Sequence, residues 1–222
     1  MSIADNLAAI QARVQAACVA AGRRPDAVRL VAVSKTKPVA AIEEALAAGQ
    51  LVFGENYAQE LRDKATHIEG VEWHFIGHLQ RNKARHVAGT AALVHAVDTV
   101  KLARELAKRA PNGQDILLEV NVGEELSKAG VLPEDALARC EELEQVDGIR
   151  LRGLMTIPPL DQDPGRYFQM LADIASEGRR RGLGLDELSM GMSADFEVAI
   201  AHGATLVRVG SAIFGRREPL RR

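Results

Sequence analysis

The sequence predicts an α/β fold, a (β/α)8 TIM barrel with one extra helix at the N-terminus. Eight short apolar runs alternate with eight helical segments, and strict alternation of this kind gives a parallel sheet. Eight such units are the number that closes a barrel. The chain has 222 residues, 47% of them hydrophobic, which suffices for one large core. We therefore expect residues 1–222 to form a single domain.

The extra helix is expected at the start of the chain. Apolar residues recur at helical spacing from Ile3 to Ala21. Ser2 is placed to cap this helix, Asp5 suits its first turn, and Gly22 follows its end. The segment is therefore expected to be an amphipathic helix that precedes the first strand.

The eight strands are predicted from apolar runs of strand length. In the first of them Val31, Ala32 and Val33 follow one another, which is typical of a parallel strand buried on both faces. The expected strands are Val28–Ser34, Gln50–Gly54, Val71–Gly77, Ala92–Val97, Asp115–Asn121, Ile149–Thr156, Leu188–Gly191 and Thr205–Gly210.

The helices that follow the strands are predicted from helical spacing and from their boundaries. Gly49, Gly182 and Gly203 come just after expected helix ends, and Pro133 stands at a helix start. The expected helices are Val39–Ala48, Asn56–His67, Leu79–Val87, Thr99–Ala110, Pro133–Leu143, Pro164–Arg181 and Ala194–His202, with a short last helical turn near Ser211.

An open, doubly wound sheet is the alternative architecture. Such a sheet would be favoured by a G-x-G-x-x-G turn after the first strand. That turn instead reads Ser34-Lys35-Thr36-Lys37-Pro38, so we prefer the barrel.

Composition argues against several classes of function. A formal net charge of −2 argues against a dedicated nucleic-acid binder, and the basic runs Arg179–Arg181, Arg216–Arg217 and Arg221–Arg222 are typical of solvated surface or tail. No apolar run approaches the length of a membrane span, and the N-terminus lacks the pattern of a signal peptide. Cys18 and Cys140 are far apart and lack C-x-x-C spacing, which indicates reduced thiols. We expect a cytoplasmic monomer with no nucleic-acid or membrane partner.

Lys35 is the first candidate for chemistry. It stands where a strand ends and a loop leads to the next helix, which is where α/β proteins place ligand sites. A lysine desolvated by apolar neighbours has a lowered pKa and an amine that attacks aldehydes. These residues alone leave open the simpler interpretation of a surface lysine just past the strand.

Ser193 and Ser211 suggest an anion site. Each is expected to start a helix, after the seventh and eighth strands, so that two helix N-termini direct free N–H groups into one space. Gly210 lets an anion approach the backbone closely. Either serine alone could be an ordinary N-cap, but both together on adjacent strands favour a phosphate site.

A metal site is not expected. His74 and His78 are four residues apart, but the first lies in a strand, Gly77 intervenes, and no carboxylate or cysteine nearby completes a ligand set. We expect His78 to line the mouth of the barrel and His74 to be a core residue. No Ser–His–Asp or Cys–His arrangement is recognisable, and we assign no catalytic residue.

A closed barrel makes the first strand a neighbour of the eighth. A lysine and a phosphate cradle then face one ligand that carries an aldehyde at one end and a phosphate at the other. Pyridoxal 5′-phosphate (PLP) is such a ligand, and a phosphorylated sugar or ketose is the other candidate.

Six segments spread over nearly the whole chain resemble the pyridoxal phosphate homeostasis proteins. This is a single-barrel family related to the N-terminal domain of bacterial alanine racemase. The segments are Val31–Lys35, Phe53–Tyr57, Trp73–Lys83, Gly153–Ile157, Leu188–Phe196 and Val207–Gly215.

The resemblance implies roles for individual residues. It implies that Lys35 holds PLP as an internal aldimine, that Ser193, Gly210 and Ser211 bind the phosphate, and that Arg208 lies near the pyridine nitrogen. The family often has threonine at the position of Ser211, which keeps the hydroxyl.

Three further positions follow from the same resemblance. It places Asn56 and His78 around the ring and the mouth, and it matches Lys128 to a family lysine linked to cofactor handling.

Arg208 also has a physical meaning. Enzymes that use the ring as an electron sink usually keep the pyridine nitrogen protonated beside a carboxylate. An arginine is always cationic and disfavours a second positive charge on that nitrogen. Such a site suits storage or delivery of the cofactor better than most amino-acid chemistry.

Such a site is compatible with three functions. The first is a non-catalytic carrier that holds PLP as a lysine aldimine, limits free aldehyde and supplies apo-enzymes. The second is a PLP-dependent racemase-like enzyme, which needs a second base; the chain has only Tyr57 and Tyr167 as tyrosines and no second domain to supply one. The third is a Schiff-base aldolase on a phosphosugar. We expect the first, a PLP-binding domain of cellular PLP homeostasis.

Overall fold

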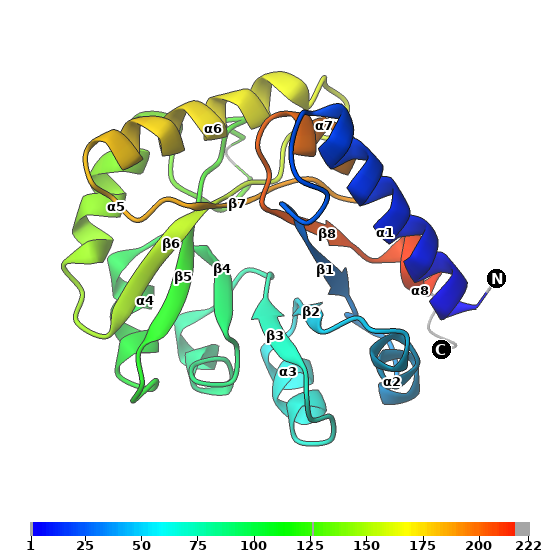
Figure 1. The fold of residues 1–222 in the computed structure, drawn as a ribbon. Helices are drawn as coiled ribbons and strands as arrows, with labels where there is room; N and C mark the ends of the chain where they lie inside the picture. The colour runs from blue at the N-terminus through cyan, green and yellow to red at the C-terminus, as the bar shows by residue number, and fades with distance from the viewer. Residues whose placement is uncertain (1, 126, 216–222) are drawn as a thin grey trace.

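Eight parallel strands close into a barrel in the order in which they follow one another along the chain (Figure 1). The computed structural model describes residues 2–125 and 127–215. The closing pair is β1 with β8, in which Val31 lies opposite Arg208. The strands are β1 (Arg29–Val33), β2 (Val52–Glu55), β3 (Glu72–Phe75), β4 (Leu93–Val97), β5 (Gln114–Glu119), β6 (Ile149–Met155), β7 (Glu187–Ser189) and β8 (Leu206–Val209).

Helices surround the barrel and connect its strands. They are α1 (Ile3–Ala20), α2 (Val39–Ala47), α3 (Ala58–Ala65), the 3₁₀ helix η1 (Arg81–His86), α4 (Val100–Ala107), the 3₁₀ helix η2 (Pro133–Asp135), α5 (Ala136–Glu144), α6 (Gly165–Arg180), α7 (Phe196–Ala201) and α8 (Ser211–Phe214). The predicted TIM barrel with an extra N-terminal helix is thus confirmed, and each expected strand overlaps an observed one.

One predicted α-helix is wrong in type. The segment expected as Leu79–Val87 forms the 3₁₀ helix η1, in which the N–H of Lys83 donates to the oxygen of Gln80. Within η1 itself only Ala84 is buried, but Leu79 and Val87 on either side of it are buried as well. The buried residues therefore have helical spacing, which does not by itself distinguish an α-helix from a 3₁₀ helix.

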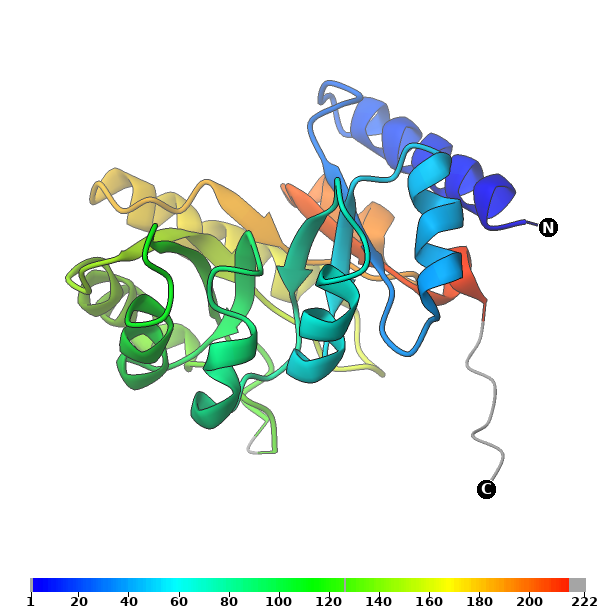
Figure 2. The same cartoon turned by 90° about the horizontal axis from the view of Figure 1, so that it is seen from below.

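Helix α1 braces the closing strands from outside. Its start has the expected cap, with the N–H of Asp5 bonded to the hydroxyl of Ser2 at 3.1 Å and the Asp5 carboxylate accepting from the Ser2 N–H. Figures 1 and 2 show α1 lying along α8, and Asn6 donates to the oxygen of Ile213 at 3.0 Å. Arg13 adds an ion pair with Glu197 of α7. The helix therefore supports the two segments that follow β7 and β8.

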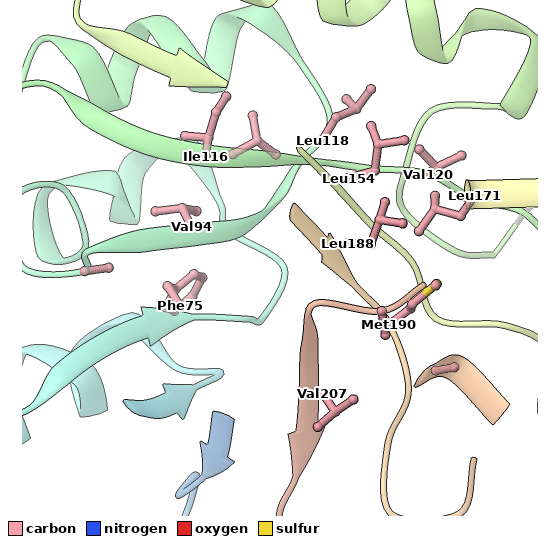
Figure 3. Packing of buried hydrophobic residues seen from close by; sticks show 14 of the residues in the cluster. Phe75, Val94, Ile116, Leu118, Val120, Leu154, Leu171, Leu188, Met190 and Val207 are labelled. Atoms are coloured by element: carbon pink, nitrogen blue, oxygen red, sulfur yellow. The ribbon is translucent and has the colours of Figure 1, made fainter. Parts of the chain in front are cut away.

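Two apolar cores lie on the two sides of the sheet. The larger core fills the space between the strands and the helices, and Figure 3 shows Ile116 and Leu118 of β5 packed near Leu154 of β6. A smaller core fills the inside of the barrel, because side chains alternate between the two faces of a strand. Its members are Val31, Val52, Leu93, Ala96, Leu117, Met155 and Leu206.

A bulge in β6 depends on glycine. Ile116 pairs with Leu151, but Leu117 pairs with Gly153, so Arg152 is an extra residue on β6. Gly153 has φ 157°, and a Cβ there would lie 1.8 Å from the oxygen of Glu187. No larger residue fits this close approach between β6 and β7.

Three further expectations concern the cysteines, the basic runs and membrane-spanning segments. Cys18 and Cys140 are free thiols, and both are buried. Arg180 and Arg181 are exposed and pair with Glu177, whereas the basic runs 216–217 and 221–222 lie outside the described residues. None of the helices in residues 2–125 and 127–215 has the length and apolar character of a membrane span.

Candidate functional site

A cavity of about 310 Å³ opens at the carboxyl ends of the strands. Six of the seven residues predicted from the sequence line it: Lys35, Asn56, Ser193, Arg208, Gly210 and Ser211. They come together because β1 closes against β8, so that the loop after β1 faces the loops after β7 and β8. The seventh, His78, is exposed and is absent from the described residues that line this cavity.

The backbone on both sides of Lys35 is held by a buried cluster that the sequence did not reveal. The ammonium group of Lys64 donates to the oxygen of Ser34 at 2.8 Å. Glu60 accepts from the N–H of Thr36 at 2.6 Å and from Lys64 at the same distance. The residues before and after Lys35 are therefore attached to one ion-paired group on α3.

This Lys64 cluster consists of Lys64, Glu55, Glu60 and the two loop residues Ser34 and Thr36. Lys64 also pairs with Glu55 at 2.7 Å, and the hydroxyl of Ser34 donates to the same carboxylate oxygen at 2.6 Å. Burial raises the pKa of the Glu55 carboxyl, although the bonds from Lys64 and Ser34 oppose that shift. Breaking a buried ion pair of this kind leaves an uncompensated charge, so the cluster is a firm anchor for the loop.

Thr36 stores backbone strain next to the candidate nucleophile. Its φ is 63°, in the left-handed region that a β-branched residue rarely adopts. Such conformations persist where the surroundings impose them, and they concentrate at functional sites. Here the N–H of Lys37 donates to the oxygen of Ser34 at 3.0 Å and closes a turn around Thr36, and the Thr36 N–H donates to Glu60.

Arg208 lies at the floor of the cavity. Its side chain is buried, with one amino group of the guanidinium bonded to the hydroxyl of Ser189 and the other to the oxygen of Thr156 at 2.9 Å. Burial lowers the pKa of this guanidinium to about 10, so it stays cationic at neutral pH. Arg208 thus presents a fixed positive charge to the cavity.

The two serines differ in their position relative to the helices. Ser211 is the first residue of α8, as expected, but α7 starts at Phe196 and Ser193 lies in the preceding turn. Helix α7 starts late because the Asp195 carboxylate accepts from the N–H of Met192 at 2.6 Å and closes that turn. In neither helix does the N-cap residue make a side-chain capping bond.

Lys37 joins the loop after β1 to Phe214 and Gly215, the last residues that the structure describes. Its ammonium group donates to the oxygens of Phe214 and Gly215, at 2.8 and 3.2 Å. The β1 loop and α8 are therefore joined directly at the rim of the cavity.

The buried oxygens that have no hydrogen-bond partner among the described residues include Oε2 of Glu55, in the Lys64 cluster, and two more near the mouth. One is Oδ1 of Asn56, which lines the cavity, and the other is Oε2 of Glu119 at the end of β5. Burial raises the pKa of the Glu119 carboxyl, and Asp98 adds to that shift. An orphaned buried oxygen such as that of Asn56 is a ready acceptor for a ligand.

Lys128 lies outside the cavity. It pairs with Glu125 on the loop after β5, and its ammonium group lies 3.5 Å from the oxygen of Pro158. Among the described residues no group of three or more His, Cys, Asp or Glu side chains is arranged to hold a metal ion.

A row of polar side chains inside the barrel was also missed. Ser189, His95, His74 and Glu72 follow one another in hydrogen-bond contact from Arg208 toward the amino end of the strands. His74 was expected in the core, but His95 stands between apolar neighbours in a strand buried on both faces. Whether the His95 side chain points into the barrel could be inferred only by counting along the strand, because inward positions recur at every second residue.

Residues 6–218 of the chain match the family model of the alanine racemase N-terminal domain. The pyridoxal phosphate homeostasis protein of Pseudomonas aeruginosa is 46% identical, over 98% of this chain and 96% of that protein. The protein of the same name from Escherichia coli K12 is 42% identical, over 97% of both chains.

Solved structures give the same grouping. PipY of Synechococcus elongatus with PLP bound has a TM-score of 0.84 and 37% identity, over 96% of this chain and 100% of that one. Alanine racemase from Corynebacterium glutamicum, at 18% identity and a TM-score of 0.70, shares the fold over 99% of this chain and 62% of its own.

Proposed function

This chain belongs to the alanine racemase N-terminal domain family, among the pyridoxal phosphate homeostasis proteins, and from that premise we propose that it binds PLP and buffers or supplies it in the cell. The observation that carries the proposal is the single cavity shared by Lys35, Arg208 and Ser211. These residues offer an amine, a buried cation and a hydroxyl to one ligand.

The residues present fit this cofactor. A cavity of about 310 Å³ is at the lower end of the range for small-molecule sites. Lys35 stands on one wall, Ser193, Gly210 and Ser211 stand on the neighbouring wall, and Asn56 offers an unpartnered acceptor. When bound, the cofactor supplies an aldehyde with which an amine condenses.

Each of these residues has a proposed role. Lys35 binds the aldehyde covalently, and the Lys64 cluster keeps its backbone in place. Ser193, Gly210 and Ser211 donate hydrogen bonds to the phosphate. Arg208 faces the pyridine nitrogen as a fixed cation and keeps a proton off that atom.

Three further residues lie at or near the outer mouth of the cavity. Asn56 borders the ring with its free oxygen, and His78 stands at the exposed rim. Lys128 pairs with Glu125 beside the rim loops, and we propose that it contacts the cofactor only during entry or exit.

The proposed role is non-catalytic. Two-base racemisation needs a second base on the face of the substrate opposite the lysine. Tyr57 is 51% exposed. Tyr167 lies on α6, and its hydroxyl donates to Gln162 in the loop that precedes this helix. Neither tyrosine is among the described residues that line the cavity. The fixed cation of Arg208 also makes the ring a poor acceptor of electrons.

The proposal extends to the setting of the protein. We propose that residues 1–222 act as one PLP-binding domain, as a monomer in the cytoplasm, and that apo-enzymes receive the cofactor from it. Buried free thiols at Cys18 and Cys140 are compatible with a reducing compartment.

Absorption spectroscopy of the purified protein mixed with PLP tests the function. We expect a visible band near ~420 nm that borohydride removes, with the reduced adduct on Lys35. A preparation that stays colourless with excess PLP overturns PLP binding. Rapid deuterium exchange at the α-carbon of added amino acids overturns the non-catalytic role.

A further inference from the structure

Five polar side chains form one hydrogen-bonded relay through the inside of the barrel, from the cavity to the opposite end of the strands. Arg208 donates to Ser189, whose hydroxyl lies 2.8 Å from Nδ1 of His95. Nε2 of His95 lies 2.9 Å from Nδ1 of His74, and Nε2 of His74 lies 2.8 Å from Glu72. We call these residues the barrel relay.

The hydrogen bonds between the side chains of the barrel relay have one donor-to-acceptor order. The Glu72 carboxylate can only accept, because His74 and Arg29 hold its pKa down to about 2. His74 therefore carries its proton on Nε2 and accepts at Nδ1 from Nε2 of His95. His95 in turn accepts at Nδ1 from the Ser189 hydroxyl, which leaves the oxygen of Ser189 to accept from Arg208.

Charges at the two ends keep the relay in that direction. Burial lowers the pKa of His74, and it lowers the pKa of His95 well below its usual value, so both rings are neutral. A proton on His95 would stand one hydroxyl away from the cation of Arg208. At the far end Glu72 is held in turn by Arg29 at 2.9 Å.

The groups around the relay are consistent with this polarity. Two cations, Arg29 and Arg152, and two carboxylates, Glu187 and Asp115, surround the Glu72 end. Glu119 and Asp195 face Arg208 from neighbouring strands and loops. Each ring nitrogen and each hydrogen of the two neutral imidazoles is used once. The relay is therefore fully satisfied, the condition under which a buried polar network specifies one arrangement.

We propose that the barrel relay is a positioning device, in which Glu72, His74, His95 and Ser189 fix the guanidinium of Arg208 toward the pyridine nitrogen of the ligand. This inference rests on the proposed function for the identity of that ligand. A buried arginine held only by the oxygen of Thr156 could turn about that bond. The contact with Ser189 removes this freedom, and Glu72 fixes which way the Ser189 hydroxyl points.

The first test needs no cofactor. Nitrogen-15 NMR of the histidine rings in cofactor-free protein is expected to show His74 and His95 as neutral rings protonated on Nε2. Glu72→Ala is expected to remove this single tautomer at His74. Glu187→Ala is the matched control, since Glu187 also lies near Arg29, at 3.7 Å, but bonds to Thr205 rather than to a ring. A wild-type His95 that is protonated on Nδ1 or on both nitrogens overturns the relay.

The second test reads the ring nitrogen itself. PLP labelled with nitrogen-15 in the ring is titrated while bound to the wild type, to Ser189→Ala and to the Glu187→Ala control. Release of Arg208 in Ser189→Ala is expected to raise the pKa of the ring nitrogen by about one pH unit. An unchanged pKa in Ser189→Ala overturns the positioning role.

The two tests separate the inference from the function on which it rests. A wild type that takes up no PLP overturns the proposed function and the purpose of the relay together. The tautomers in the cofactor-free protein still report whether the relay exists. Should Ser189→Ala fail to fold, His95→Gln takes its place, with the same shift of the ring-nitrogen pKa expected and an unchanged pKa overturning the role.

Discussion

The ammonium nitrogen of Lys64 lies 2.8 Å from the backbone oxygen of Ser34, the residue immediately before Lys35. A lysine on α3 thus reaches under the loop that carries the proposed nucleophile. The same ammonium group pairs with two carboxylates, and one of them holds the N–H of Thr36. The ammonium group of Lys64 therefore holds the loop on both sides of Lys35. If this group moved away, the buried carboxylate of Glu55 would lose its cation.

Removal of that charge should destabilise the protein strongly. Lys64→Met leaves Glu55 buried without its cation, and we expect the free energy of unfolding to fall by about 3–5 kcal/mol. Adding Glu55→Gln should recover part of the loss, because the second change removes the unpaired carboxylate. Urea unfolding measures both variants, and Lys101→Met on the exposed face of α4 is the control. Equal losses in the single and double variants would show that the ion pair is not the cause.

Replacement of Lys35 should separate the covalent bond from the rest of the binding. Lys35→Ala is expected to lose the visible band of the bound cofactor but to retain weaker binding, because the phosphate contacts remain. Lys37→Ala should keep the band, since Lys37 bonds to α8 through Phe214 and Gly215. Absorbance and mass spectrometry after borohydride reduction distinguish the two. A reduced adduct on Lys37 in the wild type would reverse the assignment.

The two serines of the cavity should act together on the phosphate. Each of Ser193→Ala and Ser211→Ala is expected to weaken PLP binding by about 0.5–1.5 kcal/mol, and the double variant more than either. Equilibrium dialysis measures the dissociation constants. Pyridoxal without its phosphate is the control ligand and should bind all variants alike. Should the double variant bind PLP as well as a single one, the serines do not share a phosphate site.

Stability should fall as the pH drops below the ordinary histidine range. Burial holds the pKa of His95 well below 6.5 and lowers that of His74, so the unfolded chain binds protons that the folded protein does not. Their contribution is therefore fully present above about pH 6.5 and is lost as the pH falls toward the folded values, by up to about 1.4 kcal/mol per pH unit for each proton.

Urea unfolding between pH 5 and pH 8 measures this slope. His95→Gln should flatten it, whereas the exposed His67→Asn should leave it unchanged. A wild-type stability that stays level from pH 8 to pH 5 would show that neither buried ring remains neutral.

The architecture was predictable because it depends on patterns that repeat along the chain. Alternation of strands and helices, with glycine after the helix ends, is enough to indicate a closed barrel. The prediction fails where the spacing of apolar residues fits more than one local conformation. Leu79, Ala84 and Val87 are all buried at helical spacing, yet the segment forms a 3₁₀ helix. The start of α7 is moved to Phe196 by a turn that Asp195 closes.

The cavity was predictable because strand ends in a barrel converge, which brings Lys35 and Ser211 together. The supports of the cavity were not predictable in the same way. Lys64 occurs among charged residues of α3 and is typical of a solvated helix face, although its side chain is buried. His95 and Ser189 are polar residues in strands buried on both faces, where the sequence does not show which face is the barrel interior.

The closure of β1 against β8 determines when the protein can first hold a ligand during its own synthesis. Lys35 leaves the ribosome early, but Arg208 and Ser211 emerge only after strands β1 to β7 have been made. A nascent chain therefore carries Lys35 without the groups that complete its cavity. The proposed capture of PLP must wait for the late strand to pair with the early one, so the finished barrel is the first species in which the whole cavity exists.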